Sequence, residues 1–400
     1  MTMVDSSETA LLAGPTRADD PKTSQIVEVA RKHGVSPFRQ LREMVTLRFS
    51  RAKLEFSEYY ACGAFDPAIP MERKKDFVGE TSSRRINDRL SPLKLSVNRG
   101  FIRDKVLYTA LVSRMGFRTT HTQAVVHGTR GFGDLLALRS AAQVRKFLLE
   151  TANYPLFGKP CEGSGSIGSA LILGVDRDAE TLSLGNGREI ELGKFCEEVV
   201  RDYPEGFIFQ DALKQDPKME AVTGKAVGTV RVVTLRDTET PRVFYSVWKL
   251  PSPSAMSDNF WQAGSMIAAL DAETGQIQKV RRGTGLGTEW IENHPVSGIR
   301  FEGFQIPHWG EVRDMTVRAH ALFPEFGVIG WDIGVTPDGP AIIEANANPL
   351  HSLWQVANAR GFDNPEFAPA LEAASEQSRK MHKESVLLHN ARILAKKRKG

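Results

Sequence analysis

The sequence is poor in cysteine and has no long apolar run. Its three cysteines, Cys62, Cys161 and Cys196, lie far apart and lack the His/Cys spacing of a zinc site, so neither a disulfide framework nor structural zinc is predicted. No apolar run approaches the roughly 20 residues that a membrane helix requires, and the N-terminus carries no basic-then-apolar signal. These absences predict a cytoplasmic protein without a transmembrane segment.

Outside its C-terminal tail the chain also lacks an excess of positive charge. The net charge is +4, but residues 379–400 hold eight Lys/Arg and one Glu, so the rest of the chain sums to about −3. A protein body that binds nucleic acid normally carries a basic face, so we expect no nucleic-acid partner. We interpret the tail as solvated, and an anionic membrane surface or nucleic acid as its partner is the lesser alternative. The tail closes with Lys396, Lys397, Arg398 and Lys399.

Length and composition predict a globular chain with more than one lobe. The 400 residues are 41% hydrophobic and 25% charged, which is enough for two or three lobes with a cleft between them. Residues 1–25, rich in Ser, Thr, Asp and Pro, are expected to form a disordered tail. Residues 26–100 are expected to form a helical N-terminal region, and residues 363–400 a basic C-terminal helix or tail.

A stretch in the C-terminal quarter, residues 327–349, concentrates candidate metal ligands. Two apolar runs, 328–335 and 341–345, flank the turn-forming residues 336–339 and predict a β-hairpin. Polar residues in such strands are rarely buried unless they are paired or bind a metal, and oxygen-only ligands suit Mg²⁺. The alternative is a surface hairpin whose polar side chains face water. Three polar residues interrupt the apolar runs: Asp332, Glu344 and Asn346.

The face that Asp332 occupies depends on the length of the turn. With a loop of only Pro337-Asp338, Asp332 would lie opposite Ile343, on the face away from Glu344. A three-residue loop, a type I turn with Gly339 in the left-handed conformation, instead places Asp332 opposite Glu344. Pro-Asp-Gly suits the longer loop, so we expect three oxygen ligands on one face. The other face then holds Trp331, Ile333, Val335, Ala341, Ile343 and Ala345.

Two lysines and a glycine-rich turn predict a binding site for anionic groups. Lys105 stands at the start of a helix expected over residues 104–115, where a solvated helix lysine is the alternative. Lys159 precedes a turn between strands whose exposed N–H groups can line an anion, although glycine-rich hairpins without function are also common. The turn is not a P-loop, because no Gly-Lys-Ser/Thr ends it and a strand follows. Its candidate binding residues are Gly163, Ser164, Gly165 and Ser166.

Two later strands add further candidates. Residues 207–213 form a buried strand that runs into polar residues, where backbone groups can meet a planar base; a linker strand between lobes is the alternative. The runs 227–235 and 242–249 predict an antiparallel pair. Arg231, flanked by valines, can grip a phosphate if its face lines a cleft, and is otherwise an edge charge. The candidates on the first strand are Gln210, Asp211 and Leu213.

The order of these parts resembles the ATP-grasp superfamily. A helix-start lysine, a strand lysine with a Gly/Ser hairpin, a linker strand and a strand arginine precede an Asp and a Glu-x-Asn on a terminal hairpin. The resemblance covers roughly residues 37–362. It implies an α+β fold in which two α/β lobes with antiparallel sheets, residues 101–213 and 214–362, clasp ATP. Similarity to the sugar-transfer-associated ATP-grasp family is carried by Asp258-Asn259, His294-Pro295, Gly330-Trp-Asp332-Ile and Gly339-Pro-Ala-Ile-Ile-Glu344.

The resemblance also implies roles for the candidate residues. Lys105 and Lys159 would hold ATP phosphates beneath the 163–168 hairpin, and the end of the 207–213 strand would meet adenine at the hinge between lobes. Arg231 would contact the transferring phosphoryl group, which makes it a candidate catalytic residue together with Lys159. Such a reaction requires spread positive charge, which lysines, an arginine and divalent ions supply. Two Mg²⁺ ions, replaceable by Mn²⁺, would be held by Asp332, Asn346 and a bridging Glu344.

The implied activity is that of a Mg-ATP-dependent ligase. It would activate a carboxylate as an acyl phosphate for attack by an amine or similar nucleophile, on small-molecule substrates in cell-surface polysaccharide or related metabolite biosynthesis. Two alternatives remain open: a kinase that phosphorylates a hydroxyl of a small molecule, and a nucleotide-binding regulator without catalysis.

Overall fold

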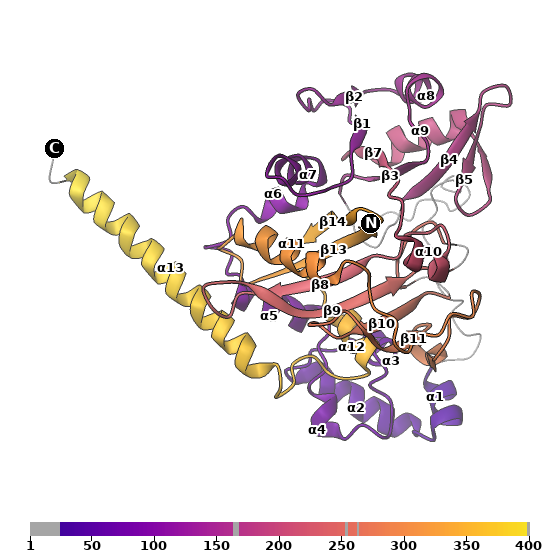
Figure 1. Cartoon of the computed structure of the whole chain (residues 1–400). Coiled ribbons are helices and arrows are strands. Elements are labelled where there is room, and N and C mark those ends of the chain that lie inside the picture. The colour runs from indigo at the N-terminus through magenta and orange to yellow at the C-terminus, as the bar shows by residue number, and fades with distance from the viewer. Residues whose placement is uncertain (1–24, 163–167, 253–254, 262–263, 398–400) are drawn as a thin grey trace.

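The computed structural model describes residues 25–162, 168–252, 255–261 and 264–397, without the side chains of 393–397. The expected N-terminal tail therefore lies outside the described residues, apart from its last residue, and so does the 163–166 turn. In the described part, the expected α+β architecture, with two sheet-based lobes and a helical N-terminal region, is confirmed. Figure 1 shows the two sheets one above the other, with the N-terminal helices beneath the lower sheet.

The N-terminal region begins with five helices, of which the first four enclose a small core, whereas Leu90 of the fifth packs with residues of the large sheet. The longest helix starts as the sequence predicts, because the Ser36 hydroxyl accepts a hydrogen bond from the Arg39 N–H and Pro37 takes the first helical position. Val29, Leu47 and Tyr59 are buried between the helices. The helices are α1 (Gln25–His33), α2 (Pro37–Phe49), α3 (Phe56–Ala61), α4 (Met71–Lys74) and α5 (Glu80–Leu90).

The smaller lobe is built on a sheet that, among the described residues, has seven strands in the order β2-β1-β7-β3-β4-β5-β6. Only the β1–β2 pair is parallel. Two helices, α8 (Ala141–Glu150) and α9 (Leu192–Asp202), cover one face through buried apolar side chains. The strands are β1 (Thr122–Val126), β2 (Leu136–Leu138), β3 (Leu156–Pro160), β4 (Ala170–Asp176), β5 (Thr181–Leu184), β6 (Glu189–Glu191) and β7 (Phe207–Asp211).

The larger lobe contains an antiparallel sheet, also of seven strands in the described residues, in the order β12-β11-β10-β9-β8-β13-β14. The helix α10 (Pro217–Thr223) and the short 3₁₀ turn η1 (Gly285–Gly287) lie in its connections. The strands are β8 (Val230–Leu235), β9 (Arg242–Leu250), β10 (Met266–Leu270), β11 (Ile277–Arg282), β12 (Glu289–Ile291), β13 (Val328–Thr336) and β14 (Gly339–Asn346).

Different helices cover the two faces of the large sheet. The helix α11 (Trp309–Ala321) packs on the face that carries Trp248 and Trp331. On the opposite face, α12 (Ser352–Asn358) covers the β9–β10 part through Leu353 and Val356. Elsewhere on that second face, Val233 and Leu235 of β8 pack with Leu90 of α5. Leu213, which follows the small-lobe strand β7, reaches Gly334 of β13.

Two helices around the start of the expected small lobe, near residue 101, pack with the larger core. They are α6 (Arg99–Arg103) and α7 (Lys105–Arg114). Ile102, Tyr108 and Val112 are buried in the same cluster as the large-sheet residues. The small-lobe sheet itself starts only at β1, so α7 can present its first residue, Lys105, to the large sheet.

The turn between β13 and β14 is shorter than predicted. Thr336 pairs with Gly339, so the loop contains only residues 337–338 and the predicted three-residue loop is wrong. Gly339 does adopt a positive φ of 108°, a conformation that glycine tolerates better than other residues. Taken alone, a two-residue loop would place Asp332 on the face away from Glu344.

A β-bulge restores the register that the shorter turn would lose. Ile343 is the extra residue of β14, because Ile333 pairs with Ile342 whereas Asp332 pairs with Glu344. The shorter loop pairs Ile333 with Ile342 and Gly334 with Ala341, so the expected positions of Ile343 and Ala341 on the core face are wrong. The predicted opposition of Asp332 and Glu344 is confirmed, but its cause is the bulge rather than the loop.

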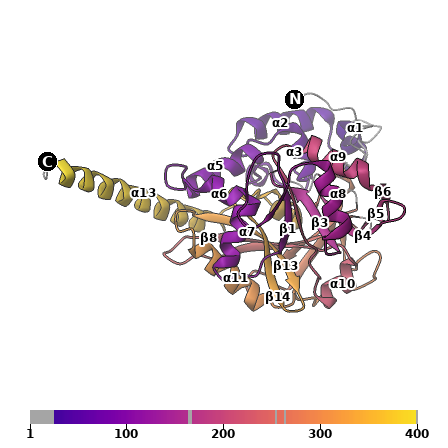
Figure 2. The same ribbon diagram turned by 90° about the horizontal axis from the view of Figure 1, so that it is seen from above.

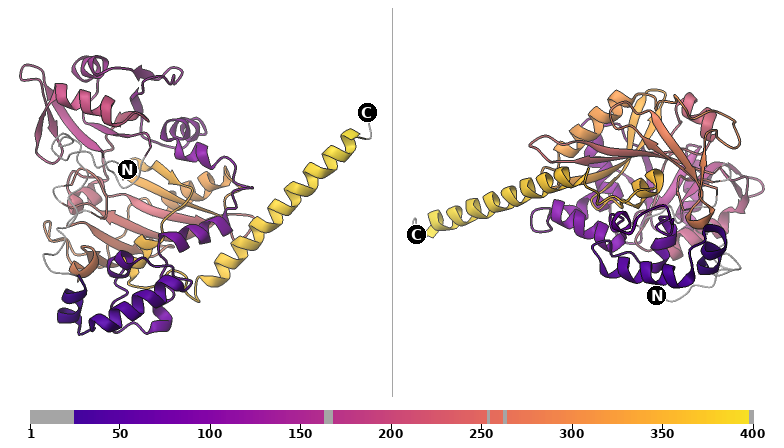
Figure 3. Two further views of the ribbon diagram at one scale, coloured as in Figure 1. Left: turned by 180° about the vertical axis from the view of Figure 1, so that it is seen from behind. Right: turned by 90° about the horizontal axis from the view of Figure 1, so that it is seen from below.

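The C-terminal helix α13 (Ala368–Lys397) leaves the body of the molecule. Its first part packs on α5, where Leu371 and Ala374 are buried and the Ser378 hydroxyl donates to the Leu90 carbonyl (2.6 Å). Side chains 383–392 are all exposed, and Figures 2 and 3 show the helix projecting away from both lobes. Within the described part of the chain, no helix is long and apolar enough to cross a membrane.

Candidate functional site

Three charged side chains form a row across adjacent strands of the large sheet. Arg231 on β8 pairs with Asp332 on β13, which in turn pairs with Glu344 on β14. Directly opposed residues in a sheet project from the same face, so the three side chains are neighbours. The Arg231 side chain is only 11% exposed and is paired with Asp332, so it is not a solvent-facing edge charge.

Asp332 is the centre of a buried ion network. The Arg231 guanidinium donates to both carboxylate oxygens of Asp332, with Nε–Oδ1 2.7 Å and Nη2–Oδ2 2.9 Å. Lys249 Nζ lies 3.2 Å from Asp332 Oδ1 and 2.8 Å from Asp258 Oδ2. Burial alone would raise the pKa of Asp332, but the Arg231 and Lys249 cations hold that pKa well below its usual range. Asp332 is therefore ionised at neutral pH.

The two predicted phosphate-binding lysines lie near Glu344, the last residue of this row. Lys105 Nζ lies 3.8 Å from Glu344 Oε1 and donates to the Cys161 carbonyl (3.4 Å). Lys159 on β3 is buried, and this burial lowers its pKa to about 8, although the Glu344 charge acts in the opposite direction. Cations from both lobes therefore meet at Glu344.

The predicted adenine-binding residues lie at the end of β7, but their side chains differ in what they contact. The Gln210 amide donates to the Thr122 hydroxyl (3.2 Å), and Asp211 Oδ1 accepts from Gln123 Nε2 (2.6 Å). These two side chains therefore hold β7 to β1. Leu213, in contrast, reaches the large sheet.

Leu213 lies over a glycine of the large sheet. A Cβ added to Gly334 would stand 2.7 Å from Leu213 Cδ1 and 3.1 Å from Ile343 Cδ1. The two side chains thus approach the bare backbone of β13 from either side, and only glycine leaves room for them. Leu213 and Ile343 remain partly exposed, so they form an apolar surface at the end of the ionic row.

The oxygen donors of the row suit a small divalent cation. Asn346 Nδ2 lies 3.4 Å from Asp332 Oδ2, which brings all three predicted metal ligands together. Among the described residues, no group of three or more His, Cys, Asp or Glu side chains could hold a metal by itself. Two carboxylates and an amide nevertheless fit Mg²⁺, which usually binds one or two carboxylates and completes its shell with water and substrate phosphates.

Lys249 and Asp258 are site residues that the sequence reasoning missed. Lys249 ends an apolar strand in the same way that Arg231 interrupts one, so the argument applied to Arg231 would have found it. Asp258 was noted only for its family resemblance, yet it accepts hydrogen bonds from both Lys249 and the Thr229 hydroxyl. Lys249 therefore bridges two carboxylates. It is the fourth cation at the site, after Lys105, Lys159 and Arg231.

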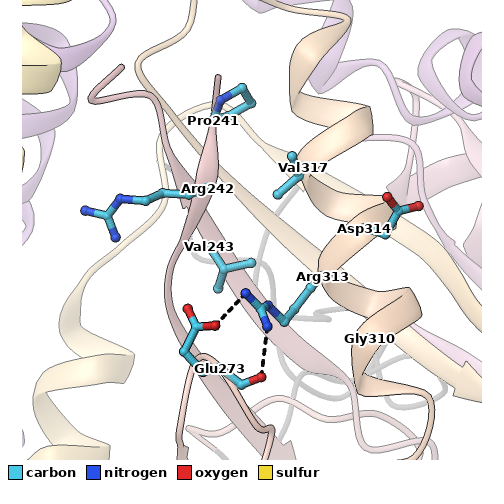
Figure 4. Close-up of a pocket in the computed structure, with 8 residues that line it drawn as sticks. All are labelled: Pro241, Arg242, Val243, Glu273, Gly310, Arg313, Asp314 and Val317. Atoms are coloured by element: carbon cyan, nitrogen blue, oxygen red, sulfur yellow. Dashed lines mark hydrogen bonds and ion pairs between the residues drawn. The ribbon is translucent and has the colours of Figure 1, made fainter. Parts of the chain in front are cut away.

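A surface hollow elsewhere on the large lobe is separate from this row. Figure 4 shows it between the start of β9 and α11, with Arg313 bound to Glu273 (Nη2–Oε2 2.6 Å). Val243, which lines it, belongs to the core on the α11 face of the sheet. The hollow is lined by Pro241, Arg242, Val243, Glu273, Gly310, Arg313, Asp314 and Val317.

Residues 88–366 match the family described as "Sugar-transfer associated ATP-grasp". The match covers well over half of the 400 residues, so the chain is an ATP-grasp protein. More particularly, it belongs to the sugar-transfer associated ATP-grasp family, as its resemblance predicted. No curated protein matches the chain.

Solved structures with a similar fold include two D-alanine–D-alanine ligases and a biotin carboxylase. The D-alanine-D-alanine ligase of Coxiella burnetii is 10% identical with a TM-score of 0.41, and the match covers 74% of this chain and 62% of the ligase. The Bacillus anthracis D-alanine–D-alanine ligase is 12% identical (TM-score 0.38; 72% and 70% covered). The Campylobacter jejuni biotin carboxylase is 11% identical (TM-score 0.39; 69% and 46% covered). The chain thus spans less than two thirds of the first and third of these proteins.

Proposed function

We propose that the protein is a Mg-ATP-dependent ligase that activates a carboxylate as an acyl phosphate for attack by an amine or similar nucleophile. The observation that carries this proposal is that Lys105 and the buried small-lobe residue Lys159 lie near Glu344, in a row of oxygen donors on one face of the large sheet. Phosphoryl transfer from ATP requires this combination, because charge is spread over the phosphate oxygens in the transition state. The cations are Lys105, Lys159, Arg231 and Lys249.

ATP would lie between the lobes with its phosphates over the ionic row. Lys105 and Lys159 would bind phosphate oxygens. The adenine would rest on the apolar surface of Leu213 and Ile343, whose side chains pack over Gly334. Gln210 and Asp211 would support the hinge by holding β7 to β1.

Asp332, Glu344 and Asn346 would hold two Mg²⁺ ions, or Mn²⁺ in their place. The bound ions would neutralise and orient phosphate oxygens. Arg231 keeps Asp332 ionised and fixed in orientation through two hydrogen bonds. Lys105 lies close enough to Glu344 to exchange that carboxylate for a phosphate oxygen as ATP arrives.

The reaction would proceed in two displacements. An acceptor carboxylate oxygen would attack the γ-phosphorus, and the bond to the β-phosphate oxygen would break to release ADP. The nucleophile would then attack the acyl carbon, and phosphate would leave with the former carboxylate oxygen. Arg231 and Lys249 would stabilise the charge on the transferring group. Excluding water protects the acyl phosphate, which favours a site enclosed between two lobes.

The proposed substrates are a small-molecule carboxylate and a small nucleophile, in cell-surface polysaccharide or related metabolite biosynthesis within the cytoplasm. The polysaccharide context rests on the description of the family alone.

Incubation of the protein with Mg-ATP and a library of small carboxylic acids, with hydroxylamine as the trapping nucleophile, tests the proposal. The expected result is ADP release together with an acid-dependent hydroxamate. A stable phosphorylated hydroxyl compound without hydroxamate would instead establish the kinase alternative. Tight Mg-ATP binding with no turnover of any acid would favour the regulator.

A further inference from the structure

We propose that Asn87 and His351 are positioning residues for the metal-binding end of β14, so that the N-terminal helices are a working part of the site. The inference rests on the function proposed above. Asn87 lies on α5 and immediately precedes residues 88–366, the part of the chain that matches the family. Its side chain is completely buried and holds the segment 346–351, which consists of the last residue of β14 and the loop after it.

Asn87 holds this segment at two points. Its Nδ2 donates to Asn348 Oδ1 (2.7 Å) and to the Pro349 carbonyl (2.8 Å), which uses both amide hydrogens. Ser83, one turn earlier on α5, accepts from the His351 N–H (3.3 Å). Two residues of one helix thus hold three residues of the segment.

His351 connects Asn87 to the sheet beneath the site. His351 Nε2 lies 3.0 Å from Asn87 Oδ1, and its Nδ1 lies 2.9 Å from the Tyr245 hydroxyl. Asn87 Oδ1 can only accept, so Nε2 carries the imidazole proton and Nδ1 accepts from Tyr245. The ring also stacks on Phe362, with centroids 3.8 Å apart and an angle of 4° between planes. Only one orientation of the imidazole meets all of these contacts.

The segment matters for the site because Pro349 lies against the row of charged residues. A Cβ added to Gly330 would stand 2.8 Å from Pro349 Cβ, 3.5 Å from Arg231 Cδ and 3.6 Å from Asn346 Cβ. Pro349 therefore rests on the backbone of Gly330, between the arginine and the amide. Release of Pro349 from Asn87 would loosen the position of Asn346 and the packing beside Arg231.

A hydrogen-bond network that only stabilises the fold would also be buried and fully satisfied. The test must therefore measure metal binding directly. Mn²⁺ is titrated into the protein in the presence of a non-hydrolysable ATP analogue, and bound Mn²⁺ is measured by electron paramagnetic resonance. We expect Asn87→Ala to weaken Mn²⁺ binding about 10- to 100-fold, the usual effect of removing a group that orients metal ligands. Affinity for the analogue without metal should change much less.

The variant Asn87→Asp distinguishes the hydrogen bonds that Asn87 donates to Asn348 and Pro349 from the one that it accepts from His351. An aspartate keeps the size of the side chain and can accept from His351, but it cannot donate to Asn348 or Pro349. Mn²⁺ binding should therefore weaken in Asn87→Asp as it does in Asn87→Ala. This isosteric variant also keeps the inference testable if the alanine variant fails to fold.

Gln40→Ala is the matched control. Gln40 is as buried as Asn87 and lies in the same helical region, where its Nε2 donates to the Ile26 and Val35 carbonyls (2.9 and 2.7 Å). It does not touch the segment 346–351, so its loss should lower the melting temperature and leave Mn²⁺ affinity unchanged. Equal Mn²⁺ affinity in the wild type and Asn87→Ala, or an equal loss in Gln40→Ala, would overturn the inference. Absence of Mn²⁺–nucleotide binding in the wild type would instead overturn the proposed function itself.

Discussion

Asp332 lies directly opposite Glu344 only because Ile343 is inserted into β14 as a bulge. The two-residue loop places Ile343 toward Gly334 and Leu213, away from the core. The loop therefore sets the apolar surface of the site, and the bulge sets the juxtaposition of the carboxylates beside it. Bulges bend a strand and redirect its side chains, and they are enriched at active sites for this reason.

The carboxylate of Glu344 should be essential for turnover but not for folding. Its closest cation is Lys105 Nζ at 3.8 Å, beyond hydrogen-bond distance, and its side chain is 32% exposed; glutamine also keeps the size of the side chain, so the fold should tolerate the change. We expect Glu344→Gln to abolish ATP turnover while the thermal unfolding curve stays close to that of the wild type. Unchanged ATP consumption in this variant would remove the metal-site assignment. Glu366→Gln, which breaks an exposed ion pair with Arg360 on the surface, should leave turnover intact.

Arg231 should matter for both stability and rate. Its ion pair with Asp332 is largely buried, and removal of one partner from such a pair typically costs about 3–5 kcal/mol. Lys249 remains beside Asp332, so we expect a loss near the lower end, about 3 kcal/mol, for Arg231→Ala in denaturant unfolding. The rate of the chemical step should fall more than ATP affinity, because the proposed role of Arg231 is on transition-state charge.

Arg242 provides the comparison for Arg231. It lies on the neighbouring strand and pairs with Asp237 (2.6 Å), but its side chain is 50% exposed. Exposed pairs contribute roughly 0–1 kcal/mol, so Arg242→Ala should change the free energy of unfolding by no more than about 1 kcal/mol. Equal losses in Arg231→Ala and Arg242→Ala would contradict the buried network.

The hairpin illustrates what local sequence can and cannot predict. Alternation of apolar and polar residues identified the strands, and carboxylates in apolar strands identified the metal ligands. The loop length was inferred from Pro-Asp-Gly and was wrong, because the bulge at Ile343 has no signature in the residues around it. Lys249 could have been found from its own strand, since it follows the same pattern as Arg231.

Contacts between segments far apart in the chain could not be predicted from local sequence patterns. Asn87 and Asn348 are separated by 261 positions, and nothing near Asn87 distinguishes it from a surface residue of a polar helix. No candidate site residue was therefore predicted in the N-terminal region. Only the packing of α5 against the segment after β14 reveals its connection with the site.

ATP binding should weaken as the pH rises above about 8. Burial lowers the pKa of Lys159 to about 8 from the ordinary 10.5, so the side chain loses its charge above that pH in the free protein. A neutral amine binds phosphate oxygens less strongly, so the dissociation constant of ATP should rise by up to about tenfold per pH unit. Fluorescence titration with an ATP analogue between pH 7 and 10 measures this change. Lys159→Arg should give a flat profile, because arginine stays charged throughout.

Stability should move in the opposite direction over part of the same range. Between about 8 and 10.5 the unfolded chain holds a proton on Lys159 that the folded protein has lost. The free energy of unfolding contributed by Lys159 therefore increases with pH in this window. Denaturant unfolding of the wild type should show this rise relative to Lys159→Met, which does not titrate. A parallel fall of stability and ATP affinity would contradict the burial of an uncompensated lysine.

The outer half of α13 should be dispensable for both folding and ATP turnover, whereas its inner half should not. Leu371 is buried against α5, and replacement of a buried leucine by alanine costs about 2–5 kcal/mol. Leu387 on the same helix is 58% exposed, so Leu387→Ala should change the free energy of unfolding by no more than about 0.5 kcal/mol. Deletion of residues 383–400 removes only exposed described side chains and should leave ATP turnover unchanged. If Leu387→Ala were as destabilising as Leu371→Ala, the projecting helix would have to be covered in solution, and the loss would then depend on protein concentration if a second copy covers it.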